Sequence, residues 1–271
     1  MNVRVKFAKY GNMKFIGHLD VMRYFQKAIK RANLPIVYSM GYHPHQIMSF
    51  ANPLGVGVTS ESEYVDLELT NEGSISVEEI TKRLDETMTE GFKILGCRIL
   101  PDPLSGRKRE TAMSLITAAD YLVSLKDGYA FLLSREETLN KLAEFFALEQ
   151  IPIVKEVKKS GREEEMNVKN YFYAQASSKE EMLSKCEITA NYYADCNLPV
   201  YVEETPLLAE QYENGISFAL RLSSGSSVNI KPEVIMEAFC GFCGCEFLPF
   251  AWQYHRFGMY TGTPDAFSCI F

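Results

Sequence analysis

Along the first hundred residues, the spacing of hydrophobic positions switches between two periods. Residues 3–9 alternate apolar and charged side chains, which is typical of a half-buried strand. Residues 18–34 place apolar side chains on one face of a helix and cations on the other, and Pro35 ends this helix. The pattern then predicts an apolar segment over 46–58, a strand over 64–69, a helix over 76–88 and a strand over 92–100. This order, β-α-β-β-α-β, is the ferredoxin-like arrangement.

The second half of the chain repeats the same order of patterns. It predicts strands over 121–125, 151–158, 168–174, 216–222 and 252–260, and helices over 134–148 and 233–242. We therefore predict an α+β fold of two tandem ferredoxin-like units. The expected division is a first unit over 1–101, a linker over 102–114, and a second unit over 115–271 with an insertion near 175–213.

The composition indicates how large the hydrophobic core can be and in which cellular compartment the protein is expected. The chain has 271 residues, 46% of them hydrophobic, which is enough for a large core. It contains no run of about 18 apolar residues that could span a membrane, and its first residues lack the pattern of a signal peptide. The seven scattered cysteines indicate reduced thiols. We expect a cytoplasmic protein without a membrane partner.

Charge is distributed unevenly along the chain. The first 50 residues carry eight lysines and arginines against one acid, Asp20, whereas the whole chain has a net charge of −7. The surplus of seven cations there leaves the other 221 residues at −14. Three of the four histidines lie in the same basic segment. Because a local cationic patch attracts anions even on an acidic protein, we expect an anionic ligand at this segment.

Candidate chemistry lies in the basic segment. His18 and Asp20 fall at the start of the predicted helix, where backbone N–H groups can bind an anion, although Asp20 also suits a surface ion pair with Arg23. Histidines can transfer protons near neutral pH, so the candidates for catalysis are His18, Asp20, His43 and His45. The chain has no complete catalytic motif, and the sequence does not decide between an enzyme and a binding protein.

Aromatic residues are interleaved with the cations of this segment. Aromatic platforms beside lysine and arginine are used by proteins that bind single-stranded nucleic acid. We expect Phe15 and Phe50 in the core, and Tyr38 and Tyr42 on the surface because they flank glycine and histidine in a loop. The predicted nucleic-acid-binding residues are Lys14, Arg23, Lys27, Lys30, Arg31, Tyr38, Tyr42, His43 and His45.

A cysteine run is the strongest metal candidate by ligand type. Cys240, Cys243 and Cys245 form a CxxCxC sequence, and Cys269 or His255 could supply a fourth ligand. The run falls at the end of an apolar helix, however, where buried cysteines behave as small hydrophobic residues. We therefore favour no metal site and expect no cofactor.

Residues 6–69, together with Lys231 and Pro232, resemble a known family. The motifs that carry the resemblance are Phe15-x-Gly17-His18-Leu19-Asp20-x-x-Arg23, Tyr38-Ser39-x-Gly41-Tyr42-His43-Pro44-His45, Pro53-Leu54-Gly55 and Glu63-Tyr64-x-Asp66. Together they are similar to the radical-SAM-linked domain of unknown function in bacteria. The resemblance implies a separately encoded radical S-adenosylmethionine protein as partner, and it transfers no catalytic residue.

Three functions follow from these observations. The one we prefer is an RNA-binding accessory module that holds tRNA or rRNA for modification by the radical S-adenosylmethionine partner. The second is an RNA-processing enzyme in which His18 and either His43 or His45 act as acid and base. The third is a scaffold that docks the partner protein and binds a small anionic substrate, or no nucleic acid at all.

Overall fold

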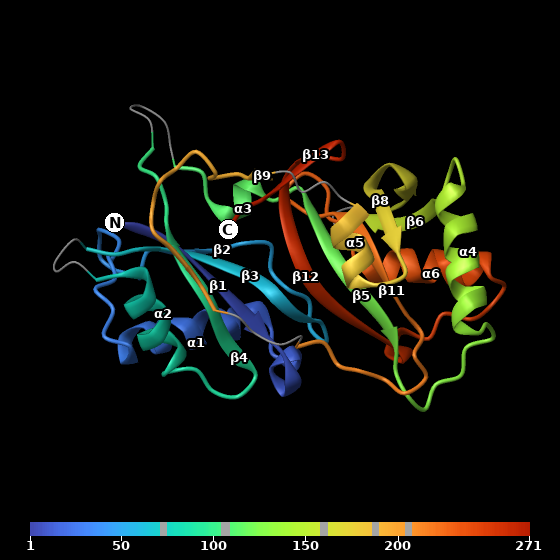
Figure 1. The fold of residues 1–271 in the computed structure, drawn as a ribbon, viewed down its shortest axis with the longest axis horizontal. Coiled ribbons are helices and arrows are strands. Elements are labelled where there is room, and N and C mark those ends of the chain that lie inside the picture. Colours follow the sequence, from blue (N-terminus) through green and yellow to red (C-terminus); the bar gives the residue numbers. More distant parts are fainter. Residues whose placement is uncertain (71–74, 104–108, 158–161, 186–189, 204–207) are drawn as a thin grey trace.

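Strands from both halves of the chain join in one continuous sheet (Figure 1). The computed structural model describes residues 1–70, 75–103, 109–157, 162–185, 190–203 and 208–271. The first half contains β1 (Asn2–Lys9), the 3-10 turn η1 (Gly11–Phe15), α1 (His18–Arg31), β2 (Met48–Phe50), β3 (Thr59–Glu68), α2 (Val77–Asp85) and β4 (Phe92–Ile99).

The second half has the same kinds of element and several short additions. Its helices are α3 (Ala112–Leu115), α4 (Arg135–Ala147), α5 (Lys179–Lys185) and α6 (Pro232–Phe242), with 3-10 turns η2 (Val168–Tyr171) and η3 (Pro249–Ala251). Its strands are β5 (Ala118–Leu125), β6 (Pro152–Val157), β7 (Arg162–Asn167), β8 (Phe172–Ala176), β9 (Ala190–Asn191), β10 (Val200–Val202), β11 (Ser217–Ser223), β12 (Trp252–Thr263) and β13 (Ala266–Cys269).

The strand order is the same in the two halves. In the first half it is β4-β1-β3-β2, and in the second it is β12-β5-β11-β8, with antiparallel pairing throughout. The halves are joined where β3 pairs with β12 in parallel, with His255 opposite Thr59 and Arg256 opposite Ser60. We call this junction the seam.

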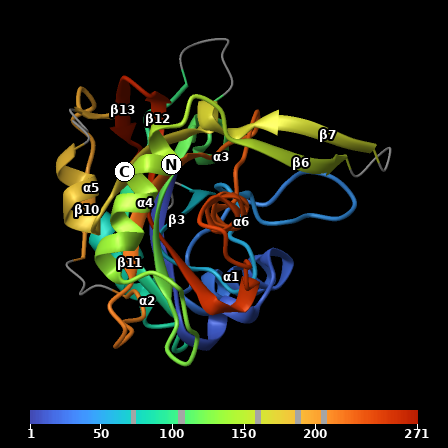
Figure 2. The ribbon, with the colours of Figure 1, turned by 90° about the vertical axis from the view of Figure 1, so that its right-hand side faces the viewer.

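Each half has its own core, built from the alternation that the sequence shows. In β1, Val3, Val5 and Phe7 point to the side covered by α1 and α2, and they pack in one apolar cluster with Phe25 of α1. In the second half, α4 and α6 cover β5, β11 and β12 through a larger cluster that includes Phe239. Figure 2 shows α1 and α6 on the same side of the sheet and α5 on the other.

The structure confirms the α+β class and shows a large, mostly antiparallel sheet. The predicted strands over 151–158 and 168–174 are placed differently, because β6 and β7 form a separate two-stranded sheet and β8 begins only at Phe172. The predicted division into units stays a prediction, and parts of its linker and insertion, at 104–108, 186–189 and 204–207, lie outside the described residues. No helix in the described ranges is long and apolar enough to cross a membrane.

Candidate functional site

The seam is short and is reinforced by side chains. Only two residue pairs join β3 to β12. Ser60 Oγ donates to the Arg256 carbonyl at 3.0 Å, and Gln253 Nε2 donates to the Gly57 carbonyl at 3.0 Å. These bonds hold the segment 52–58, which precedes β3, against the strand that carries Arg256.

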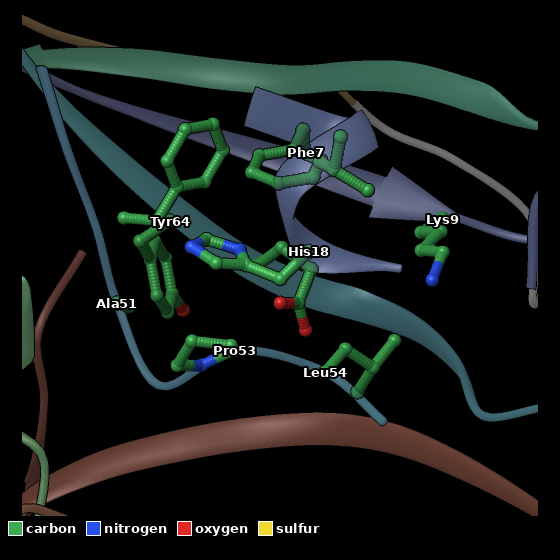
Figure 3. Close-up of a pocket in the computed structure, with 10 residues that line it drawn as sticks. Phe7, Lys9, His18, Ala51, Pro53, Leu54 and Tyr64 are labelled. Carbon is green, nitrogen blue, oxygen red and sulfur yellow. The ribbon is translucent and has the colours of Figure 1, made fainter. Parts of the chain in front are cut away.

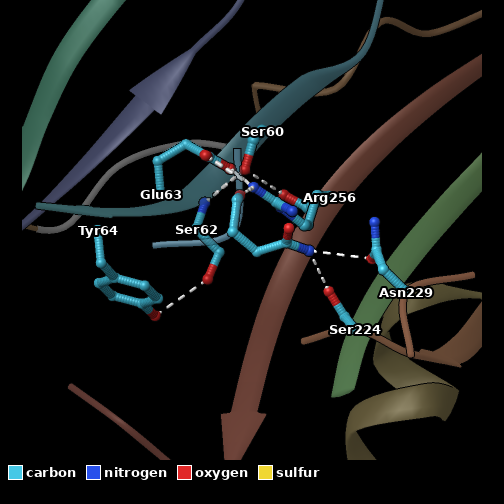
Figure 4. Close-up of polar contacts among 8 residues, drawn as sticks. Ser60, Ser62, Glu63, Tyr64, Ser224, Asn229 and Arg256 are labelled. Carbon is cyan, nitrogen blue, oxygen red and sulfur yellow. Dashed lines mark hydrogen bonds and ion pairs between the residues drawn. The ribbon is translucent and has the colours of Figure 1, made fainter. Parts of the chain in front are cut away.

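A buried ion pair lies beside the seam. Arg256 donates from Nε and Nη2 to Glu63 at 2.6–3.0 Å, and its side chain is 1% exposed (Figure 4). Arg256 Nη2 also donates to the Asn52 carbonyl at 2.8 Å. Burial lowers the pKa of Arg256, but the Glu63 carboxylate outweighs it and the net shift is upward. The pair therefore stays ionised and fixes both strands and the 52–58 segment.

A cavity of about 480 Å³ opens on the helical side of this ion pair. Its floor includes Tyr121 and Arg256, one wall is the 52–58 segment, and the other is the start of α6. Asn52 connects the two walls, since its Nδ2 donates to Ser224 Oγ at 2.6 Å and to Asn229 Oδ1 at 3.1 Å (Figure 4). A concave site of this size is in the range that holds a small molecule or one nucleotide.

A smaller pocket of about 20 Å³ adjoins this cavity and shares Pro53 and Leu54 with it. His18, Lys9 and Glu63 line it (Figure 3). Its volume suits about one water molecule. Glu63 therefore lines the small pocket, while its partner Arg256 lines the cavity.

His18 is an uncharged side chain at neutral pH. It is the first residue of α1, and its ring packs edge-on against Phe50 with centroids 5.5 Å apart. Burial lowers the pKa of His18 from its ordinary value of 6.5; the Glu63 carboxylate opposes this shift and the Lys9 ammonium adds to it. A neutral imidazole can accept a proton or a hydrogen bond, but it adds no positive charge to the basic segment.

An acidic residue holds the other face of the seam. Glu61 of β3 pairs with Lys179 of α5 and lies 3.4 Å from His255 Nε2. Burial raises the pKa of Glu61, but the His255 and Lys179 partners outweigh this effect and bring the pKa to about 2.

Glu61 therefore predicts a loss of stability in acid. Its folded-state pKa is below the ordinary 4.5, so its contribution is present above pH 4.5 and is lost as the pH falls toward 2. We expect Glu61→Gln to flatten the dependence of the unfolding free energy on pH in this window. Denaturant titrations at several pH values measure this slope. An unchanged slope in the variant contradicts the prediction.

The exposed cations of α1 form a basic face. Arg23, Lys27 and Lys30 recur at helical spacing and are exposed, with 70% of the Arg23 side chain accessible. Arg23 forms a 3.4 Å surface pair with Asp20, and Arg31 donates to the Thr87 carbonyl at 3.1 Å. The two central lysines therefore contribute charge without a partner in the described residues.

Lys14 does not belong to this face. Its ammonium forms an ion pair with Glu210 at 2.5 Å and a 3.2 Å hydrogen bond with Gln253 Oε1. It joins the first half of the chain to the second, beside the seam.

The loop over 38–46 projects beside the basic face (Figure 2). Its base is closed by a bridge between Tyr38 and Gln46, and Gln46 Nε2 donates to the Gln26 carbonyl of α1 at 3.2 Å. Met40 and Tyr42 at its tip are fully exposed. His43 and His45 are also exposed. His45 Nδ1 is bonded to Ser39 Oγ at 2.8 Å.

The histidine candidates do not form one constellation. His18 faces the small pocket, whereas His43 and His45 are in the exposed loop. In the part of the chain that the structure describes, no hydrogen bond or ring contact joins His18 to either loop histidine. The pairing of His18 with them as acid and base has no support in these contacts.

The cysteine run packs into the core of the second half. Burial raises the pKa of Cys240 to about 12 and that of Cys243 to about 11, so both thiols stay protonated. Cys245 Sγ donates to the Cys240 carbonyl, and His255 is engaged by Thr59 and Glu61. Among the described residues, no group of three or more metal-ligating side chains comes together.

Several residues of the site are not predictable from the local pattern. Arg256, Tyr121 and Glu233 come from the second half, and the sequence motifs alone do not connect them to Glu63. The available signal is an arginine in the predicted strand over 252–260, where it stands among mostly aromatic and apolar residues. The expectation that Phe15 is in the core was wrong, since it is 62% exposed, whereas Phe50 is buried as expected.

A family model matches residues 2–200, which include α1, the 38–46 loop and β3. The chain belongs to this family, described as "Uncharacterized protein conserved in bacteria (DUF2344)". The match covers the basic face and one wall of the cavity, and it ends before α6 and β12. No curated protein is similar enough to match the chain.

Proposed function

We propose that this protein is an RNA-binding accessory module that works with a separately encoded radical S-adenosylmethionine enzyme in modifying tRNA or rRNA. The observation that carries the proposal is the basic face of α1 beside the projecting loop over 38–46. The two are adjacent because Gln46 bonds to the Gln26 carbonyl. A phosphate chain and its bases are the ligand to which these two surfaces are complementary.

The electrostatic part of the proposal rests on Arg23, Lys27 and Lys30. Their spacing of four and three residues aligns them along one side of α1. Exposed cations attract phosphates and release the bound counterions, which makes binding depend steeply on salt. The second half of the chain carries a net negative charge, which favours the first half as the side that a polyanion approaches.

The aromatic part of the proposal rests on the loop tip. A fully exposed Tyr42 contributes nothing to the core, and neighbouring His43 is exposed as well. Planar rings in such a position can stack on unpaired bases, which favours single-stranded regions and loops of RNA.

A protein partner is supported by apolar exposure at η1 and in the 52–58 segment. Phe15 and Val56 are each 62% exposed, and their segments are tied together by the hydrogen bond from Gly57 N to the Lys14 carbonyl at 2.8 Å. We propose this surface for the radical S-adenosylmethionine partner. Co-expression of the two proteins tests it: the complex should survive nuclease and high salt, and Phe15→Glu with Val56→Glu should disrupt it. Loss of the complex on nuclease treatment would assign the contact to RNA instead.

Charge reversal on the basic face tests the RNA-binding function. We expect Lys27→Glu with Lys30→Glu to weaken binding of a single-stranded RNA by at least about tenfold at low salt, because two phosphate contacts become repulsive. Arg31 is left unchanged because it bonds to Thr87. Fluorescence anisotropy over a range of salt concentrations gives both the affinity and the salt slope.

The matched control reverses two exposed cations elsewhere, Lys82 of α2 and Arg135 of α4. It changes the net charge by the same amount and should leave RNA affinity within about twofold. Equal losses in the two double variants would mean that net charge alone drives binding, and unaltered affinity in both would remove the proposed interface.

The tandem ferredoxin-like interpretation is also a proposal. It is supported by the repeated order, β4-β1-β3-β2 and β12-β5-β11-β8, each with two helices on the same side of the sheet.

A further inference from the structure

We propose that the cavity between the 52–58 segment and α6 binds the guanine base of an unpaired RNA nucleotide. The delivery of the base by RNA rests on the proposed function, whereas the complementarity of the cavity to guanine does not. The cavity is distinct from the basic face, which contacts phosphates whatever the sequence.

The cavity has the volume and the rigid floor that a nucleic-acid base needs. At about 480 Å³ it accommodates a purine with part of its ribose. Pro53, Leu54 and Pro232 provide apolar surface against which a planar ring can pack. Arg256 forms part of the floor, and its guanidinium already donates to Glu63 and to the Asn52 carbonyl, so it shapes the space without needing a ligand.

Glu233 gives the cavity its specificity. This residue of α6 lines the cavity, and its Oε2 is buried without a hydrogen-bond partner among the described residues. The nearby phenol of Tyr254 is also buried and unpartnered. An unsatisfied buried carboxylate oxygen is costly, and we infer that the Glu233 side chain turns toward the cavity when a ligand there donates hydrogen bonds to both of its oxygens.

Guanine matches this requirement better than the other bases. Its Watson–Crick edge has two neighbouring donors, N1–H and N2–H, and one carboxylate can accept from both. Adenine and cytosine each place a ring-nitrogen acceptor next to a single amino donor, and uracil places its one N–H between two carbonyls. A carboxylate would therefore face a repulsive lone pair in each of these three.

The start of α6 can hold the phosphate of the same nucleotide. Pro232 is the first helical residue and has no N–H, and Lys231 before it makes no side-chain capping bond. Lys231 is exposed and lines the cavity. Its ammonium and the first free N–H groups of the helix favour an anion at the entrance while the base lies inside.

Calorimetric titration with the four nucleoside 5′-monophosphates tests this inference on the full chain. We expect GMP to bind at least about tenfold more tightly than AMP, CMP or UMP. Glu233→Gln should lower the affinity for GMP by at least about tenfold and so abolish the preference. The amide NH2 group takes the place of one of the carboxylate oxygens that accept hydrogen bonds from guanine. Glu237→Gln, on an exposed position of the same helix, is the matched control and should leave GMP affinity unchanged.

A second variant blocks the cavity without touching the core. Val56 lines the cavity and is 62% exposed, so Val56→Trp adds bulk from the solvent side and should exclude all four nucleotides. Thermal melting confirms that each variant folds. Absence of GMP binding at millimolar concentration, or equal GMP binding by the wild type and Glu233→Gln, would overturn the inference.

The experiments distinguish failure of the RNA-binding proposal from failure of the guanine-binding proposal. Lys27→Glu with Lys30→Glu should weaken RNA binding but leave GMP binding intact, since neither lysine lines the cavity. If GMP binds and RNA does not, the cavity is a site for a free nucleotide and the RNA proposal is wrong. If RNA binds through α1 but GMP does not bind, the basic face stands and the base-binding cavity is wrong.

Discussion

Replacing Arg256 with methionine is expected to destabilise the protein by about 3–5 kcal/mol, because it leaves the buried Glu63 carboxylate without its partner. Glu63 is only 8% exposed at its side chain, so water replaces little of the hydrogen bonding that is lost with the guanidinium. The Asn52 carbonyl loses a donor in the same step. Denaturant unfolding followed by tryptophan fluorescence measures the change, since Trp252 lies on the same strand.

A double variant separates the ion pair from the loss of packing. Arg256→Met with Glu63→Leu removes both charges, and it should recover most of the stability lost in the single variant. The exposed pair between Arg23 and Asp20 is the control, and Arg23→Met should cost less than about 1 kcal/mol. If the double variant is as unstable as Arg256→Met, the charge of Glu63 is not the cause.

Replacing Phe25 with alanine is expected to cost about 3–5 kcal/mol through the cavity it leaves. Phe25 is completely buried, and its ring lies 4.6 Å from Phe7, 5.4 Å from Phe50 and 5.9 Å from Phe92 between centroids. The aromatic cluster joins α1 to three strands, so few neighbours can move to fill the space.

The control for this variant is Leu19→Ala on the exposed side of α1. Leu19 is 61% exposed, and its truncation should change the unfolding free energy by less than about 0.5 kcal/mol. Similar losses at the two positions would show that helix propensity, and not burial, sets the stability. Phe50 also contacts His18. We therefore expect Phe25→Ala to leave the His18 ring less firmly packed against Phe50, even where the variant is still folded.

The periodic parts of the fold could be predicted from the sequence. Alternation in residues 3–9 and helical spacing in 18–34 fix β1 and α1 because one face of each must be buried. The predicted helix starts near Ser76 and Ser134 are also found: Ser76 accepts a hydrogen bond from Glu79 N, and Ser134 forms a complete capping box with Glu137. The exposure of Tyr42 followed from its glycine-containing loop.

The seam and the cavity could not be predicted in this way. They depend on a contact between β3 and β12, whose paired residues are 196 positions apart, and no local period reports such a pairing. Lys14 looked like a surface cation because its acidic partner, Glu210, lies in the other half. Phe15 looked like a core residue because hydrophobicity alone does not show that η1 turns it outward.

The pairing of β3 with β12 also affects the order of events during synthesis on the ribosome. Arg4 is completely buried, and its Nη1 donates to the carbonyl of Ile270 at 2.8 Å. Arg4 of β1 therefore obtains one of its hydrogen-bond partners only after residue 270 has been added. Until β12 has been added, the Thr59–Ser60 end of β3, which β2 does not pair with, is open and available to other chains. We expect the nascent protein to depend on rapid synthesis of β12, or on a chaperone that covers this part of β3 until then.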